Sequence, residues 1–478
     1  MKYADMENKE SVLGNTYIDR FERLIAILYC CALPYRLLVQ LSVLKNIFGV
    51  CANYSSFLFH VIGILLWIYN ENGTPCLGRK RHLIANAGYL VLYLNTSSLI
   101  MACFIQAVYG NHGSENAFQG VFGMIVYFLQ YFLMFIYNYR VFQLVSLENI
   151  RKILHINCIC LLVIGYMQIL VMNNIGGSLY DTLNVFKILN DSTHLPKLCL
   201  TGTEGATAGQ ILGVFVFPFL YSLYIKGNKL IIIEILLWII PTYYTKSATV
   251  YLVTIIDVSI FLIICVFKDK KDRGYLLLFF IIAIISFLII LQIIGVLDKV
   301  RVEEIRYLLF DKARDYTGNG STASRTVPLV VSWGAFKEYP LLGVGNGLQG
   351  YFYEKYFPEW AYHVEGSDVK TFLNRSRSGI GNAGVFIPGL LSGYGVVGCT
   401  FIALFFKKII WEANRMRKDM NYFFFAYIIS MVAIVFLGFS TDYYGAYFVW
   451  FFFSLPLIEY NGTKEYKVVT KPIGRYFK

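Results

Sequence analysis

The sequence has few charged residues for its length. Only 15% of its 478 residues are Asp, Glu, Lys or Arg, whereas a soluble domain carries roughly 25%. Hydrophobic residues make up 57%, and the mean hydropathy is +0.56. A chain this long and this apolar cannot bury its hydrophobic surface in one aqueous core. The composition therefore excludes a soluble globular domain, a disordered chain and a coiled coil, and it indicates a polytopic membrane protein.

The sequence also lacks the cysteine patterns of a metal centre or a disulfide framework. None of its ten cysteines forms a C-x-x-C pair, and most lie in apolar runs, where cysteine behaves as a small hydrophobe. It has no outward Asp-x-Asp or paired carboxylate typical of metal-dependent sugar transferases. We therefore expect no metal and no cofactor. The first twenty residues are polar and partly acidic, unlike a signal peptide, so the first hydrophobic segment is expected to stay as an anchor.

Apolar windows of about twenty residues, the length that crosses a bilayer core, recur along the chain. Pro34 and Arg36 interrupt the first window, and Lys246 alone separates two others. The pattern predicts an all-α polytopic membrane protein with about 12 transmembrane helices. The windows are 24–42, 51–69, 84–108, 118–138, 153–172, 206–225, 230–245, 247–267, 275–297, 383–406, 421–439 and 443–459.

The distribution of basic residues predicts the orientation. The net charge is +12, and with the N-terminus inside, most of the 42 Lys and Arg residues fall in cytoplasmic segments. The basic excess is therefore topological and does not indicate nucleic acid. We expect both termini to be cytoplasmic.

Two predicted outer segments are long, at about 173–205 and 298–382. Loops longer than about 15 residues are usually functional or disordered. The second segment is rich in Trp and Tyr, so we expect one long structured periplasmic loop that packs on the membrane domain. The chain thus divides into helices 1–9 over 1–297, the large loop over 298–382, and helices 10–12 with a tail over 383–478.

The most distinctive motif lies in the large loop. Arg325 precedes the run Pro-Leu-Leu-Gly-Val-Gly-Asn-Gly at 340–347. Its glycines Gly343, Gly345 and Gly347 permit a tight turn whose N–H groups can bind an anion, and Arg325 can pair with a phosphate in bidentate geometry. The same glycines are equally compatible with a turn that only docks the loop.

The order Arg325, Trp333 and this glycine run resembles the signature of the O-antigen polymerase and O-antigen ligase superfamily, whose members are bacterial multi-pass proteins. Three other segments are similar to family segments: 200–209, 245–248 and 382–398. The resemblance covers roughly residues 200–410 in pieces. It implies a GT-C-like helical fold in the bacterial cytoplasmic (inner) membrane.

The resemblance favours a polymerase over a ligase. Ligases tend to carry a His-Asn or His-Ser pair just before the large loop ends, whereas here that place reads Gly381-Asn382. The only histidine of the loop is His363. Lys246 stands where members often have the arginine of a Ser-Arg pair.

The resemblance implies a reaction on undecaprenyl-diphosphate-linked oligosaccharide. A hydroxyl of an incoming repeat unit attacks the anomeric carbon of the growing chain, which inverts as undecaprenyl diphosphate leaves. Cations must face the diphosphate, and a base must face the hydroxyl. The candidate bases are Glu204 and His363, with Asp368 and Asp442 as weaker candidates, and the candidates for the diphosphate are Lys246, Arg325, Arg375, Arg377, Gly343, Gly345 and Gly347.

Each of these candidates has a structural alternative. Cations at a membrane surface often anchor in lipid headgroups, Glu204 can interact with a helix dipole, and His363 can be an ordinary loop histidine. Expected partners are the lipid-linked oligosaccharide and membrane lipid, with a chain-length regulator and a flippase as further candidates.

Two other functions stay open, an O-antigen ligase and a lipid-linked oligosaccharide flippase or transporter. A proton-coupled transporter would use intramembrane carboxylates such as Glu234 and Asp257, although two such groups can also hydrogen-bond within a helix bundle. The large folded loop, which an alternating-access carrier rarely needs, favours the enzyme.

Overall fold

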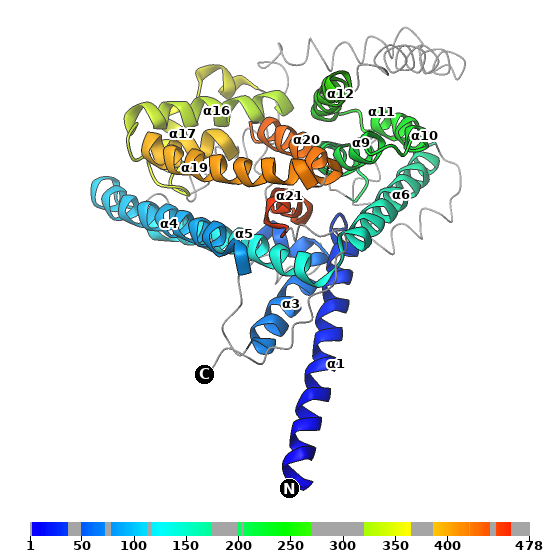
Figure 1. The fold of residues 1–478 in the computed structure, drawn as a ribbon. Helices are drawn as coiled ribbons and strands as arrows, with labels where there is room; N and C mark the ends of the chain where they lie inside the picture. Colours follow the sequence, from blue (N-terminus) through cyan, green and yellow to red (C-terminus); the bar gives the residue numbers. More distant parts are fainter. Residues whose placement is uncertain are drawn as a thin grey trace.

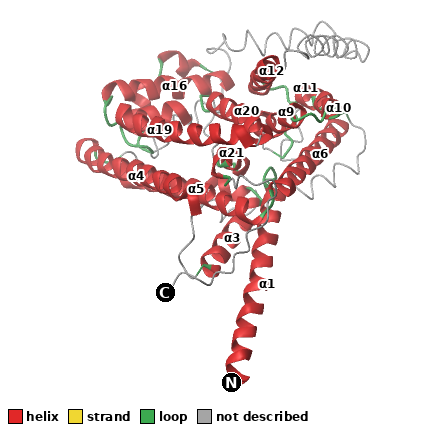
Figure 2. Ribbon diagram, viewed as in Figure 1, coloured by secondary structure: helices red, strands yellow, loops and turns green. Residues whose placement is uncertain are grey.

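The structure, a computed structural model, describes residues 2–36, 49–71, 78–111, 116–173, 198–201, 205–268, 320–364, 386–419, 421–439 and 446–459. Every regular element in these ranges is a helix, as Figure 2 shows. The elements are α1 (Lys2–Ala32), η1 (Gly49–Asn53), α3 (Ser56–Asn70), η2 (Gly78–Lys80), α4 (Arg81–Tyr109), α5 (Ala117–Leu144), α6 (Leu147–Met172), α8 (Gly205–Gln210), η4 (Ile211–Val216), α9 (Phe217–Ile225), α10 (Ile231–Leu237), α11 (Ile239–Tyr244), α12 (Ala248–Lys268), α16 (Gly320–Glu338), α17 (Gly350–Tyr356), η6 (Glu359–His363), α19 (Phe386–Asp419), α20 (Asn421–Leu437), α21 (Tyr447–Phe453) and η7 (Leu455–Leu457).

Six helical stretches in the described ranges are long and apolar enough to cross a membrane. They are Arg81–Tyr109, Ala117–Leu144, Leu147–Met172, Thr207–Ile225, Ala248–Cys265 and Phe386–Met416. The chain is therefore an α-helical multi-pass membrane protein. Each apolar window overlaps a described helix except 275–297, which lies outside the described residues. The count of about twelve spans and the GT-C likeness stay predictions.

The first window differs from the prediction of one helix over 24–42. Helix α1 begins at Lys2 and ends at Ala32, where the N–H of Tyr35 donates to the Ala32 carbonyl in a turn (3.1 Å). Pro34 explains the end, because its ring disfavours helical geometry in the preceding residue. The chain after this turn is held by the N–H of Ser55, which donates to the Tyr35 carbonyl (2.9 Å).

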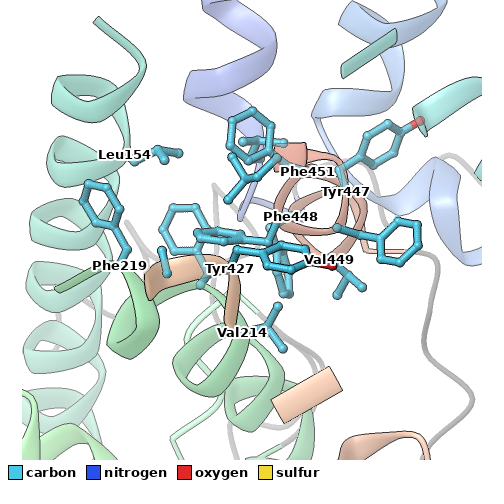
Figure 3. Close-up of a cluster of buried hydrophobic side chains, with 14 of the residues drawn as sticks. Leu154, Val214, Phe219, Tyr427, Tyr447, Phe448, Val449 and Phe451 are labelled. Atoms are coloured by element: carbon cyan, nitrogen blue, oxygen red, sulfur yellow. The ribbon is translucent and has the colours of Figure 1, made fainter. Parts of the chain in front are cut away.

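Helix α21 lies at the centre of the molecule (Figure 1), between a layer made by α4 and α5 and a layer made by α19 and α20. Its sequence is almost entirely aromatic, and its inward faces are fully buried. Burial of so many rings stabilises a helix that is too short to be stable alone. Figure 3 shows the cluster around it, with Leu154, Val214, Phe219, Tyr427, Tyr447, Phe448, Val449 and Phe451.

The described part of the predicted large loop, 320–364, is helical and packs on the membrane helices. Apolar side chains from α16, α17 and the turn between them form one buried cluster with α4 and α5. Its members are Met101, Ala102, Ile105, Ala117, Val121, Ala335, Val344, Leu348 and Phe352. The hydroxyl of Tyr351 donates to the Gly110 carbonyl (2.9 Å), which ties α17 to the α4–α5 connection.

Candidate functional site

The glycine turn at 340–347 is hydrogen-bonded to a break in α19, a helix that comes later in the chain. The helical dihedrals of α19 fail at Gly395 (φ 59°, ψ −164°), so backbone groups on both sides of the break need other partners. The glycine turn supplies them through four hydrogen bonds: Val344 N–H to Ser392 O (2.8 Å), Gly345 N–H to Gly393 O (2.9 Å), Val396 N–H to Pro340 O (2.9 Å) and Val397 N–H to Leu341 O (3.1 Å).

Glycine is required in this turn for two reasons. Gly343, Gly345 and Gly347 all have positive φ (71°, 90° and 90°), a region that other residues rarely adopt. A Cβ at Gly343 would also overlap the backbone of Gly393, and one at Gly347 would lie 2.5 Å from the Gly120 carbonyl oxygen. The glycines thus let the backbone of the turn lie close to the backbones of α19 and α5.

The amide groups of the turn are already used inside the protein. Besides the two that bond to α19, the N–H of Gly343 donates to Tyr339 O (2.9 Å), that of Asn346 to Ser98 Oγ (3.2 Å) and that of Gly347 to Gln349 Oε1 (2.9 Å). In this conformation the turn therefore does not present its amides to an anion. Its geometry is that of a turn that docks the loop on α19, so Gly343, Gly345 and Gly347 are not assigned to the diphosphate.

Arg325 and His363 belong to the same packed unit as the turn. Arg325 is half-buried on α16, whose buried face contacts α17 and η6 through Ala323, Val327 and Val331. His363 ends η6 and is exposed. Glu204, Arg375 and Arg377, and the weaker candidates Asp368 and Asp442, lie outside the described residues.

A second junction, which we call the outer junction, joins residues 198–201 to α6, to α11 and to the turn that follows α1. The side-chain amide of Gln168 on α6 makes two hydrogen bonds with Leu200, donating to its carbonyl (2.7 Å) and accepting from its N–H (2.9 Å). The N–H of Leu198 donates to Tyr244 O at the end of α11 (2.9 Å), and the Thr201 hydroxyl donates to Pro34 O (2.5 Å). Segments that are far apart in the sequence therefore meet at the predicted outer face.

Lys246 occupies a strained position in the outer junction. Its φ is +46°, and Leu200 has φ +53°; these two are the non-glycine residues with positive φ among the described residues. Such backbone strain clusters at functional sites, because the surrounding contacts must hold it. Gln168 holds the backbone of Leu200, and the N–H of Lys246 donates to the Tyr243 carbonyl (3.2 Å) two residues before α12 begins.

The sequence interpretation missed Arg36 as a member of this junction. Its side chain is 5% exposed, and its guanidinium lies 5.5 Å from the centre of the Tyr54 ring. It follows Pro34, whose carbonyl accepts from Thr201. The sequence does show an arginine inside the apolar window 24–42. Such a residue usually has a structural or functional partner, because a charge is costly to bury in a membrane.

Glu338, at the end of α16, joins three elements at the predicted outer face. Its carboxylate accepts from Lys355 Nζ (2.7 Å) and the Tyr356 hydroxyl (2.5 Å) on α17, and from the Tyr109 hydroxyl on α4 (3.3 Å). Partial burial opposes ionisation, but the bonds from Lys355 and Tyr356 hold the pKa of Glu338 below its usual value. Sequence patterns do not reveal this cluster, because its members are far apart in the chain.

Glu338→Gln is expected to lower the thermal stability in a pH-dependent way. A carboxyl whose folded pKa is depressed stabilises the protein above the unfolded pKa, about 4.3, and loses that contribution as the pH falls through the folded pKa. The difference in melting temperature between the wild type and Glu338→Gln should therefore be largest near neutrality and vanish in acid. The exposed Glu359→Gln variant corrects for general acid sensitivity, and a difference that grows in acid would contradict the assignment.

The described residues contain no group of three or more His, Cys, Asp or Glu side chains arranged to hold a metal ion. Comparison of the chain with protein-family models, with curated proteins and with solved structures finds no match.

Proposed function

We propose that this chain is a polysaccharide polymerase that joins undecaprenyl-diphosphate-linked repeat units into O-antigen or capsular polysaccharide at the outer face of a bacterial cytoplasmic membrane. The observation that carries the proposal is how the segments resembling the superfamily are paired in space. Segment 340–347 bonds to 392–398. The chain around segments 200–209 and 245–248 also meets: Leu198, just before the first, bonds to Tyr244, just before the second, and Gly209 lies against Val250, just after the second.

The proposed reaction assigns roles to side chains in both regions. The acceptor hydroxyl oxygen forms a bond to the anomeric carbon while the bond from that carbon to the diphosphate oxygen breaks. The hydroxyl proton passes to a base, for which His363 and Glu204 are the candidates. The diphosphate leaves as an ionised group, and Arg325 and Lys246, with Arg375 and Arg377, are the cations assigned to its charge. We expect no metal or cofactor to take part.

The Arg325→Ala variant tests this assignment in cells from which the gene has been deleted. Deletion should collapse the surface polysaccharide ladder on a gel to single capped repeat units, and the wild-type gene should restore it. Loss of a cation from the developing charge costs on the order of 10²–10³ in rate, so Arg325→Ala should give only very short chains. The matched control is Lys337→Ala, which removes a cation from the exposed side of the same helix and should restore the full ladder.

One result would contradict the role of Arg325 alone, and two others would contradict the polymerase. A full ladder with Arg325→Ala would remove Arg325 from the diphosphate. Normal polymer that stays on undecaprenyl diphosphate in the deletion strain would indicate the ligase. Loss of all surface sugar, with lipid-linked units retained at the cytoplasmic face, would indicate the flippase.

A further inference from the structure

Asp257 is a carboxyl buried in the membrane-spanning part of α12. It is fully buried, and neither of its carboxylate oxygens has a hydrogen-bond partner. Its position is about 14 Å along the helix from Ala248, where α12 begins, at about 1.5 Å per residue, which is about half the thickness of a bilayer core. Ionisation of a carboxyl left without partners at this depth is strongly unfavourable, because neither water nor a protein group solvates the charge.

No cation on the described neighbours of α12 can neutralise Asp257. Helices α8, η4, α9, α11 and α20 pack against α12, and none of them carries Lys, Arg or His. Their titratable groups are tyrosines, of which Tyr221 on α9 lies beside Asp257. The full set is Tyr221, Tyr224, Tyr243, Tyr244, Tyr422 and Tyr427, with Tyr251 and Cys265 on α12 itself.

The other intramembrane carboxyl has a different environment. Oε2 of Glu234 on α10 lies 2.7 Å from Nε2 of His155 on α6. Hydrogen bonding within the bundle, the alternative that the sequence left open for both residues, therefore accounts for one oxygen of Glu234, whose Oε1 has no partner, and for neither oxygen of Asp257. Glu234 is thus a natural internal control for Asp257.

Asp257 packs against the π-helical turn η4. Pro218 has no N–H and cannot donate to the Val214 carbonyl four residues earlier, which favours the wider turn. The Ser430 hydroxyl on α20 donates to that carbonyl instead (2.8 Å). Opposite Asp257 lies Gly213, where a Cβ would stand 3.5 Å from the carboxylate oxygen and would overlap Val253. The carboxyl therefore faces a bare stretch of backbone.

Polar side chains lead from this place toward the predicted outer face. Thr254 precedes Asp257 by one helical turn, and its buried hydroxyl oxygen also has no hydrogen-bond partner. Thr207 and Gln210, on the facing helix α8, are 3% and 2% exposed. Hydroxyl groups and side-chain amides both donate and accept hydrogen bonds, so buried ones along one helix interface can extend a chain of hydrogen bonds to a carboxyl.

We propose that Asp257 is a proton-binding site inside the membrane, that it carries its proton in this conformation, and that Thr254, Gln210 and Thr207 form its route of exchange with the outer face. The ligand is the proton itself. On exchange, one proton leaves the carboxyl along this route as another enters, so that charge is conserved. This site is separate from the proposed glycosyl transfer, and its test does not depend on that activity.

Infrared spectroscopy of the purified full-length protein in lipid nanodiscs tests the protonation. At neutral pH the wild type should show the carbonyl band of a protonated carboxylic acid, and Asp257→Asn should abolish it. Glu234→Gln should leave it unchanged. Heavy-carbon labelling of aspartate in the wild type should shift the band, which identifies an aspartate even if Asp257→Asn fails to fold. A wild type without the band, or a band that survives Asp257→Asn, would overturn the proposal.

Transfer into heavy water tests the route. The band should shift as a deuteron replaces the proton, and this exchange should be about tenfold slower in the double variant Thr254→Val/Gln210→Met than in the wild type, with the band intensity unchanged. Ser259→Ala is the matched control, since Ser259 lies on the exposed side of the same helix and bonds only locally to the Ile255 carbonyl (2.7 Å). Equal exchange rates in all three proteins would refute the route.

Discussion

Replacement of Gly343 by alanine is expected to lower the free energy of unfolding by about 2–5 kcal/mol, a large fraction of the roughly 5–15 kcal/mol that stabilises a typical protein. The φ of +71° alone costs about 1–2 kcal/mol for a residue with a Cβ. The added methyl group would also overlap the backbone of Gly393 and push the turn away from α19, at a cost of about 1–3 kcal/mol. Thermal unfolding in detergent, followed by intrinsic fluorescence, measures the loss.

The matched control for this prediction is Gly227→Ala. Gly227 also has positive φ (+114°), but nothing lies within 4 Å of a Cβ placed there. This variant should show the strain cost of about 1–2 kcal/mol without the contact cost. A Gly343→Ala variant no less stable than Gly227→Ala would mean that the turn does not support the break in α19.

Glu22→Gln is expected to destabilise the protein by about 3 kcal/mol, because it leaves a half-buried arginine short of a charge partner. Glu22 on α1 is fully buried, and both of its oxygens accept from Arg140 on α5 (2.7 and 2.9 Å). The same guanidinium reaches Glu71 (3.1 Å) and lies 5.6 Å from the Trp67 ring. The Asn70 amide also donates to Glu22 (2.6 Å). One carboxylate thus joins three helices.

Glu148→Gln provides the comparison for Glu22. The Glu148 side chain is 52% exposed and pairs with Arg151 one turn along the same helix, so its loss should cost less than about 1 kcal/mol. The triple variant Glu22→Leu/Arg140→Met/Glu71→Gln should recover most of the stability lost in Glu22→Gln, since it removes the cation together with both carboxylates that pair with it. Equal melting temperatures for Glu22→Gln and Glu148→Gln would show that the buried pair contributes little.

The break in α19 determines which groups of this region are left to bind a diphosphate. Non-helical backbone at membrane depth persists only where protein or water satisfies its polar groups. In this chain the glycine turn does so, and its own amides are used in return. A diphosphate would therefore be met by side chains such as Arg325 and Lys246 rather than by the turn.

Hydropathy along the chain was enough to predict an α-helical membrane protein and the approximate positions of its helices. Hydropathy reports burial in lipid or protein residue by residue, so windows such as 84–108 and 153–172 coincide with α4 and α6. Proline also acts locally, and Pro34 could have marked the end of α1. The sequence likewise indicated that Gly343, Gly345 and Gly347 form a turn, because positive φ is a local requirement of the backbone.

The contacts of these residues, in contrast, depend on how the helices pack. The amides of the turn bond to Ser392 and Gly393 of α19, about fifty residues later in the chain. No local pattern encodes whether they face these carbonyls or an anion. The same holds for Arg36 beside Tyr54 and for Glu338 beside Tyr109. It holds most clearly for Glu234 and Asp257, which look alike in the sequence. His155 lies beside the first and no cation of the described neighbours lies beside the second, because helix packing sets the neighbours of a buried charge.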